Sequence, residues 1–341
     1  MRSAIRIDLG ALRRNARRLI EELQGAELWA VVKADAYGHG ARDIAGAALE
    51  AGASVLCVFT VREAVALRGP FRDARILAMG PVEEQELPAA RDAGLEIAVG
   101  QGTIPEGVPV HLKLDTGMGR LGYRALPEPT ENVVGLMTQL ATADYDSVFA
   151  ERQLEVFRDA AERYPRLSRH AANSAAALRI PEARFDAARC GVALYGLSPF
   201  GADPAEDGLE PVLSWRSRLA QVKRLHPGES TGYGRHFVAE RHTWIGLVPV
   251  GYADGFRRDF TGTEVLVAGE RCRSVGAVSM DSFAVELPRE LPAGETVTII
   301  GDGILAEEHA RHVGTINYEI TSRIESNPER AEREVVGARD G

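Results

Sequence analysis

The stretch WAVVKADAYGHG, residues 29–40, decides the fold, because it places one lysine at the end of an apolar run that is typical of a buried strand. Lys33 closes the run, and a turn with two glycines follows. An ammonium group that leaves water loses hydration, which lowers its pKa and yields a nucleophilic amine. A lysine that forms a Schiff base requires such an amine. The alternative is a lysine that merely emerges into solvent at the strand end.

Strand and helix patterns alternate outward from this stretch. The strand patterns cover residues 28–32, 55–59, 75–78, 95–99, 110–114, 133–140, 170–172 and 187–194. The helix patterns cover residues 12–23, 43–50, 61–67, 83–91 and 151–163. This alternation predicts an α/β fold with an N-terminal (β/α)8 TIM-like barrel, whose active-site residues lie at the carboxyl ends of the strands.

Two connections of the expected barrel lack a helix pattern. Residues 100–109 are too few for a crossover helix, although an extended chain of that length still spans a strand. Residues 124–132 contain Pro127 and Pro129 and are equally poor in helix signals. We therefore expect a barrel without one or two of its outer helices.

The pattern changes after Trp215. Strand-like alternation, separated by Gly and Pro turns, recurs in residues 218–225, 243–250, 264–267, 273–278, 282–287 and 296–300. A Gly-, Pro- and acid-rich stretch at residues 200–216 marks the boundary. We expect a barrel domain over residues 1–212 and a mostly antiparallel β domain over residues 213–341.

Composition indicates an ordinary soluble enzyme. The 341 residues are 45% hydrophobic and 26% charged, and the net charge of −9 with no long basic run argues against nucleic-acid binding. Cys57, Cys190 and Cys272 are far apart and read as reduced structural thiols. The chain shows no signal-peptide pattern and no apolar stretch that would span a membrane, so we expect a cytoplasmic protein.

Seven further stretches, together with residues 29–40, resemble the alanine racemase family in family order. They are residues 110–122, 170–176, 189–196, 232–235, 248–255, 276–281 and 314–320. The family consists of fold-type III enzymes that depend on pyridoxal 5′-phosphate (PLP) and work as head-to-tail homodimers with active sites shared between chains. The resemblance implies an amino-acid racemase, an isomerase that converts L-alanine to D-alanine for peptidoglycan.

The resemblance also assigns roles. Lys33 would hold PLP covalently and act as one base, and Tyr233 from the partner chain would act as the base on the opposite face. Racemisation needs two such groups, since one removes the α-proton and the other returns a proton from the other side. The implied cofactor-binding residues, besides Lys33, are Tyr37, His170, Ser174, Arg189, Gly191, Val192 and Tyr318. Arg189 would face the pyridine nitrogen and leave it unprotonated, because arginine keeps its own proton.

Substrate contacts follow from the same resemblance. Arg120 would pair with the substrate carboxylate, and Met280 would line its site. Lys113 lies close by in sequence and is either carbamylated, as is common in the family, or paired with Asp115 or another carboxylate. The residues expected at the substrate entrance are Asp144, Tyr252 and Asp281.

The chain departs from the family pattern at Gln139, where a histidine is usual. A glutamine can donate and accept hydrogen bonds but cannot carry a proton charge, which bears on the activation of Tyr233. Two alternatives therefore remain open: a racemase for serine or several amino acids, and a PLP-binding protein with weak catalysis. A decarboxylase is disfavoured, since Arg189 stands where those enzymes place an acid.

Overall fold

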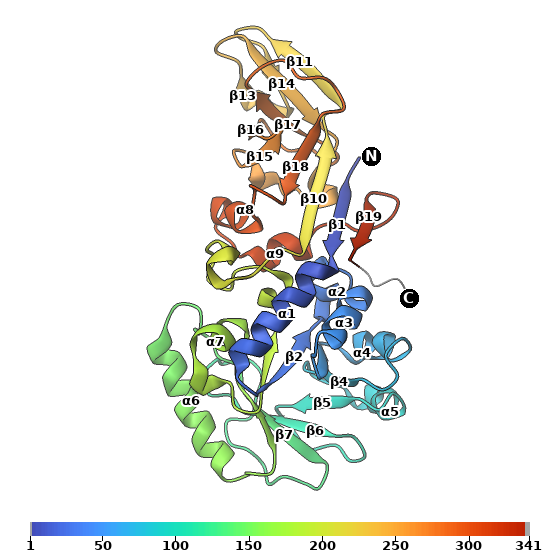
Figure 1. Cartoon of the computed structure of the whole chain (residues 1–341), viewed down its shortest axis with the longest axis vertical. Coiled ribbons are helices and arrows are strands. Elements are labelled where there is room, and N and C mark those ends of the chain that lie inside the picture. The colour runs from blue at the N-terminus through green and yellow to red at the C-terminus, as the bar shows by residue number, and fades with distance from the viewer. Residues whose placement is uncertain (1, 338–341) are drawn as a thin grey trace. The chain divides into compact units, whose positions relative to one another are not determined.

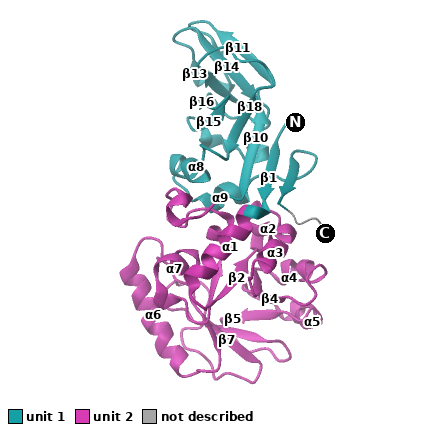
Figure 2. Ribbon diagram, viewed as in Figure 1, with its two compact units in different colours: residues 1–10, 211–341 teal, residues 11–210 magenta. Residues whose placement is uncertain are grey.

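The computed structural model describes residues 2–337, which form two compact units. One unit combines residues 1–10 with residues 211–341, and the other contains residues 11–210 (Figure 2). Residues 1–10 and 211–212, which were expected in the barrel domain, therefore belong to the other unit. The physical reason is that strand β1 (Ala4–Asp8) pairs with β10 (Leu213–Arg218) and with β19 (Glu332–Val336).

Residues 11–210 contain a parallel sheet, which has eight strands in the described chain (Figure 1). Its hydrogen-bonded order is β8-β7-β6-β5-β4-β3-β2-β9. The strands, given in chain order, are β2 (Glu27–Val31), β3 (Val55–Val58), β4 (Arg75–Ala78), β5 (Glu96–Val99), β6 (Val110–Lys113), β7 (Val133–Met137), β8 (Ser168–His170) and β9 (Ala187–Cys190). This arrangement confirms the expected TIM-like barrel.

The two edge strands of this sheet, β8 and β9, approach each other without forming a ladder. The amide of Asp186 donates to the carbonyl of Arg169 at 3.0 Å, and the amide of Arg189 donates to the carbonyl of Ala172 at 2.9 Å. These bonds nearly close the barrel, and they hold the carboxyl ends of β8 and β9 in register.

Helices accompany most of the crossovers of the barrel. They are α1 (Leu9–Leu23), α2 (Lys33–Gly38), α3 (Ala41–Glu50), α4 (Val61–Arg68), α5 (Leu87–Asp92), α6 (Ser147–Glu162) and α7 (Ser174–Arg179). Thr60 and Glu63 form a capping box at the start of α4, and Asp146 caps α6.

The connections from β5 to β6 and from β6 to β7 contain no helix, which confirms that two outer helices are missing. A backbone hydrogen bond fixes the loop after β6 instead: the amide of Tyr123 donates to the carbonyl of Lys113 at 2.8 Å. Side-chain contacts add to this, since the Tyr123 hydroxyl donates to the carbonyl of Gly102 at 2.8 Å.

The other unit is mostly antiparallel, as expected. Its sheet has nine strands within residues 2–337, in the order β11-β14-β17-β16-β15-β18-β10-β1-β19. Besides β1, β10 and β19, these are β11 (Gln221–Leu225), β14 (Thr243–Val248), β15 (Glu264–Val267), β16 (Glu270–Val275), β17 (Phe283–Leu287) and β18 (Thr296–Ile300). The short pair β12 (Ser230–Thr231) and β13 (Phe237–Val238), and the helices α8 (Ala306–Val313) and α9 (Asn317–Ser322), complete the unit.

Several boundaries differ from the sequence expectation, and two of the differences lie at the expected site. The strand expected over residues 187–194 ends at Cys190, because Gly191 (φ −117°, ψ −82°) turns the chain into a short 3₁₀ helix, η3 (Val192–Tyr195). The strand expected over residues 133–140 ends at Met137. Both strands therefore stop where expected site residues begin. No helix within residues 2–337 has the length and apolar character needed to cross a bilayer.

Candidate active site

Lys33 lies just beyond the carboxyl end of β2, and its side chain is partly buried. Burial lowers the pKa of its ammonium group, and the nearby positive charge of Arg120 lowers it further, while Glu63 opposes both effects. No hydrogen bond or ion pair of the Lys33 amine is found among residues 2–337. The side chain is therefore available to react at this edge of the barrel.

The turn after Lys33 is left-handed. Residues 34–37 all have φ between 50° and 56°, which is uncommon for residues other than glycine. The amide of Ala34 donates to Glu63 Oε1 at 2.7 Å, and the amide of Ala41 donates to Asp35 Oδ1 at 2.7 Å. These side-chain acceptors stabilise a backbone path that the sequence analysis treated as an ordinary turn.

This turn brings Tyr37 against Gly191, two expected cofactor residues that are far apart in the sequence. A Cβ atom at Gly191 would lie 2.7 Å from the Tyr37 hydroxyl, so the close approach requires a glycine. The Ser174 hydroxyl accepts the amides of Gly191 at 3.1 Å and Ala193 at 3.3 Å. Tyr37, Ser174 and the Gly191–Val192 segment therefore meet in one small polar cradle.

Arg189 is buried inside the barrel, with 4% of its surface exposed. One terminal nitrogen donates to His170 Nδ1 at 2.8 Å and to the His170 carbonyl at 2.6 Å. The other donates to the Thr138 carbonyl at 2.6 Å. Within the described chain the Nε–H has no hydrogen-bond acceptor, so it remains available to a ligand. Burial lowers the pKa of Arg189 to about 10, which still leaves it protonated at neutral pH.

Gln139 contacts Arg189 only weakly. Its Oε1 accepts from the guanidinium at 3.3 Å, and its own amide donates to the Leu140 carbonyl at 3.4 Å. Gln139 therefore keeps a hydrogen bond to the arginine. It offers no titratable group there, as its residue type predicts.

Lys113 and Arg120 line a small cleft of about 110 Å³ with Gly122 and Gln101. Burial lowers the pKa of Lys113 to about 8, and the positive charges of Arg189, Arg120 and Lys33 act in the same direction. The carboxylate of Asp115 instead accepts the amides of Gly117 and Gly119 at 3.0 Å each. Across residues 2–337 no carboxylate lies within 4 Å of the Lys113 amine, so this part of the chain supplies no ion pair to it.

Most of the expected site residues of the β unit are exposed on its surface. Tyr233 is 75% exposed, Met280 54% and Tyr252 42%. Tyr318 is the second residue of α9 and is partly buried. Asp144, in the barrel unit, is exposed and has no ion pair among the described residues. An exposed tyrosine and methionine on one unit are typical of a surface that another molecule covers.

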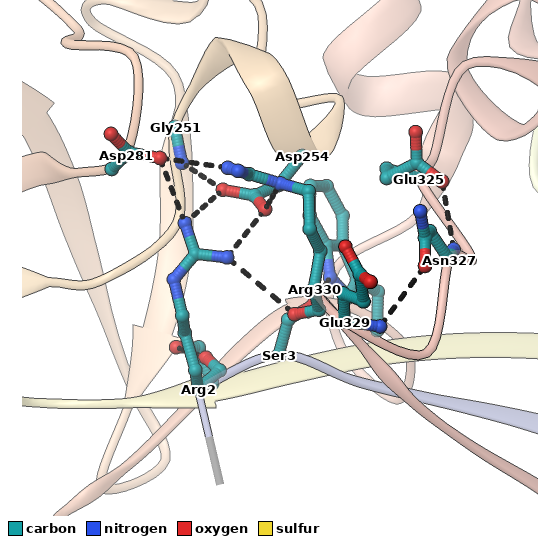
Figure 3. Close-up of polar contacts among 11 residues, drawn as sticks. Arg2, Ser3, Gly251, Asp254, Asp281, Glu325, Asn327, Glu329 and Arg330 are labelled. Carbon is teal, nitrogen blue, oxygen red and sulfur yellow. Dashed lines mark hydrogen bonds and ion pairs between the residues drawn. The ribbon is translucent and has the colours of Figure 1, made fainter.

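A cluster of two arginines and two aspartates stabilises the turns that carry Tyr252 and Met280 (Figure 3). The buried carboxylate of Asp254 accepts two bonds from Arg2, at 2.7 and 2.8 Å, and one from Arg330 Nε at 2.9 Å. Arg330 also donates to Asp281 at 2.8 Å. Asp281 thus forms part of an ion network rather than standing free.

Sequence reasoning missed three members of this cluster, namely Arg2, Asp254 and Arg330. Asp254 lies in residues 248–255, one of the stretches that resemble the family. A buried carboxylate needs cationic or hydrogen-bonding partners, and no local sequence pattern identifies them. Its partners precede β1 and β19, which are separated by almost the whole chain. Reasoning also missed His111 and Glu96, although His111 alternates with Lys113 on β6 and its side chain therefore faces the same side of the sheet.

Comparisons with known proteins relate nearly the whole chain to one family. The family "Alanine racemase, N-terminal domain" matches residues 7–199, and "Alanine racemase, C-terminal domain" matches residues 212–332. The alanine racemase of Listeria monocytogenes serotype 4a (strain HCC23) is 38% identical, covering 93% of this chain and 94% of that protein. Alanine racemase 1 of Bacillus subtilis (strain 168) is 38% identical, with 94% and 90% covered.

Solved structures show the same similarity in three dimensions. The alanine racemase from D-cycloserine producing Streptomyces lavendulae superposes with a TM-score of 0.90 at 35% identity, covering 99% of this chain and 97% of that chain. The alanine racemase from E. faecalis gives 0.89 at 36% identity, with 98% of each chain covered.

The buried histidines predict how stability depends on pH. Burial lowers the pKa of both His111 and His170, so both rings are neutral in the folded protein, whereas the unfolded chain takes up protons below pH about 6.5. The free energy of unfolding should therefore be level above pH ~7 and fall as the pH drops below ~6.5. Urea unfolding from pH ~8 to ~5 measures this.

His170→Asn should reduce that slope, and His226→Gln, which removes an exposed ring, serves as the control. A wild-type unfolding free energy that stays level or rises toward pH ~5 would contradict the assignment of neutral buried rings.

Proposed function

The chain belongs to the alanine racemase family, and on this premise we propose that it interconverts L- and D-alanine with PLP bound at Lys33, by a two-base mechanism. Membership makes the protein an amino-acid racemase, which is an isomerase.

One observation carries the proposal: four cationic side chains gather at the barrel without a carboxylate partner. They are Lys33, Lys113, Arg120 and Arg189, and in the described structure none of them forms an ion pair within 4 Å. Burial of an unpaired charge is costly, so the partly or fully buried Lys33, Lys113 and Arg189 suit anionic ligands, and the exposed Arg120 adds positive charge beside them. PLP carries a phosphate and alanine carries a carboxylate, which together would supply the missing negative charge.

The polar cradle fits the phosphate. Tyr37 provides a hydroxyl donor beside Gly191, and Ser174 provides a second hydroxyl together with neighbouring backbone amides. The free Nε–H of Arg189 fits the pyridine nitrogen, because it donates a hydrogen bond and retains its proton at neutral pH. Lys33 fits the attachment point, since its lowered pKa increases the fraction of free amine.

When bound, PLP withdraws electrons from the α-carbon of the amino acid joined to it and so acidifies the α-proton. Lys33 Nζ would take or return that proton on one face. The hydroxyl of Tyr233 would do the same on the other face. Arg120 would orient the substrate through its carboxylate, and Met280 would limit the room for its side chain.

We assign Tyr233 to a second copy of the chain. Tyr233, Tyr252, Met280 and Ile316 are between 42% and 75% exposed, and all lie in or next to the quoted motifs of one unit. Apolar side chains gathered in this way favour burial by a partner. A homodimer with shared sites would cover them and would deliver the second base.

We further propose a cytoplasmic enzyme that makes D-alanine for peptidoglycan. The substrate breadth follows from the pocket only weakly, since one hydroxymethyl in place of a methyl group changes binding by about 1–3 kcal/mol. Exchange of the α-proton in D₂O with L- and D-alanine, serine and lysine tests the function directly. We expect the fastest exchange with alanine; no exchange with any of them would favour a PLP-binding protein without catalysis.

Substitution of each base should have a distinct effect. Lys33→Ala should abolish both racemisation and the visible absorbance of bound PLP, because the covalent link is lost. Tyr233→Phe should keep that absorbance and lose most turnover, more in one direction of proton transfer than in the other. Tyr145→Phe alters an exposed tyrosine outside the motifs and is the control. A fully active Tyr233→Phe variant would show that the two-base assignment is wrong.

Mixing the two inactive variants tests the shared site. A mixed dimer of Lys33→Ala and Tyr233→Phe chains has one site with both defects and one intact site, if each site takes Tyr233 from the other chain. Unfolding and refolding the two together should therefore restore about a quarter of wild-type activity, because half of the dimers are mixed and each has one working site. Each variant refolded alone is the control. No recovery, with dimers formed, would place both bases on one chain.

Carbamylation of Lys113 would convert a crowded cation into an anionic partner for Arg120. The pKa of about 8 leaves a substantial fraction of free amine to react with carbon dioxide at neutral pH. We expect crystallographic electron density beyond Lys113 Nζ. The chain has three lysines, and exposed Lys223 provides the comparison within the same map. Density that ends at Nζ would leave Lys113 as a bare amine and contradict this assignment.

A further inference from the structure

A chain of buried polar groups crosses the barrel from Arg189 to Glu96. Arg189 bonds His170 Nδ1 at 2.8 Å, His170 Nε2 lies 2.9 Å from His111 Nδ1, and His111 Nε2 lies 2.9 Å from Glu96 Oε2. Both histidines are fully buried. The four residues come from β9, β8, β6 and β5, so the chain passes over β7.

Gly135 on β7 makes this crossing possible. A Cβ atom at that position would lie 2.0 Å from His111 Nδ1, which no packing rearrangement of a fixed ring would accommodate. Trp29 packs against both rings, with centroid distances of 5.6 Å to His111 and 4.3 Å to His170. The space between β6 and β8 is therefore shaped for two imidazoles in contact.

The donors and acceptors of this chain have one consistent direction. A guanidinium only donates, so His170 Nδ1 must accept and the proton of the neutral ring must be on Nε2. That Nε2–H donates to His111 Nδ1, and the His111 proton is then on Nε2 and is donated to the carboxylate of Glu96. The opposite direction would turn an N–H of His170 toward an N–H of Arg189.

Charge supports the same direction. Within residues 2–337, no carboxylate lies within 4 Å of the buried Arg189. Burial alone would raise the pKa of Glu96, but hydrogen bonds from His111 and Arg75 outweigh this effect and lower it to about 2. Arg75 Nε donates to Glu96 Oε1 at 2.7 Å. Glu96 is therefore an ionised carboxylate at the far end of a chain that begins at a buried cation.

We propose that Glu96 is a positioning residue for racemisation: acting through His111 and His170, it fixes the proton arrangement that holds the Arg189 guanidinium in place. The inference rests on the proposed function in one respect, which is that Arg189 serves the pyridine nitrogen. Gln139 cannot substitute for this chain, because its single bond of 3.3 Å to Arg189 leads to a backbone carbonyl and not to a charge.

Neutron diffraction from crystals of the wild-type protein loaded with PLP tests the proton arrangement without reference to activity. We expect deuterium on Nε2 of both His111 and His170 and none on either Nδ1. Deuterium on His170 Nδ1, or on both nitrogens of either ring, would overturn the proposal. This result is independent of the proposed function, since the proton positions can be read even if the protein racemises nothing.

Kinetics of a matched pair of variants tests the consequence for the reaction. Glu96→Gln removes the charge and one acceptor oxygen, whereas the carboxylate accepts from Arg75 with both oxygens, at 2.7 Å and 3.1 Å, and from His111 with Oε2. Glu27→Gln is the control: Glu27 lies 3.7 Å from the same Arg75, and its Oε2 accepts from Trp29 and Ser54 at 2.7 Å, contacts that a glutamine oxygen retains.

For Glu96→Gln we expect kcat for alanine to fall about tenfold, the lower end of the range for partners that orient a catalytic group, with KM within about twofold of wild type. The visible absorbance maximum of bound PLP should shift, because Arg189 moves relative to the ring nitrogen. Glu27→Gln should match wild type in kcat, in KM and in the absorbance maximum of bound PLP. Equal kcat and equal absorbance in the two variants would overturn the proposal, and an inactive wild type would instead count against the proposed function.

Discussion

The left-handed turn after Lys33 is the constraint on which the site depends. Four consecutive residues, 34–37, adopt a conformation that costs about 1–2 kcal/mol for each residue with a side chain. The cost is offset by bonds that only this path allows, including Gly40 N to the Asp35 carbonyl at 2.9 Å and Ala34 N to Glu63 at 2.7 Å. A right-handed helix would carry Tyr37 away from Gly191. The strained turn therefore joins Lys33 to the polar cradle.

The charged groups of the barrel lie at the two ends of the buried hydrogen-bonded chain from Arg189 to Glu96. Cations gather near Lys33, whereas the carboxylate of Glu96 lies at the other end of two neutral imidazoles. With two neutral rings between the opposite charges, every hydrogen bond of the chain donates from Arg189 toward Glu96. The rings add no third charge. The bonds of Arg189 to His170 and Thr138 hold its terminal nitrogens, and among residues 2–337 its Nε–H has no acceptor and stays open to a ligand. Cys57 and Cys190 add no charge, because burial raises the pKa of each to about 12.

Much of the fold could be predicted from local patterns. Apolar runs of strand length predicted the parallel barrel, and the ten residues between β5 and β6 excluded a helix by length alone. The left-handed turn could not be predicted, because Ala34 and Ala36 have no propensity for it and long-range contacts impose it. Lys33 and Arg189 could be singled out from their motifs. Glu96 could not, since its role depends on a contact with His111 that pairing of β5 with β6 creates.

The pairing of β1 has a consequence for synthesis of the chain. Ile7 pairs with Leu213 and with Val335, so the first strand meets its nearest partner only after about 200 further residues have been made. At about 5–20 residues per second, that interval is roughly 10–40 seconds. Residues 11–210 can fold into the barrel during this interval. The strands that pair with Ile5 and Ile7 have not yet been made. The barrel can therefore fold while the two isoleucines of β1 have no sheet partner, so the chain completes its two units in the order barrel first and β unit second.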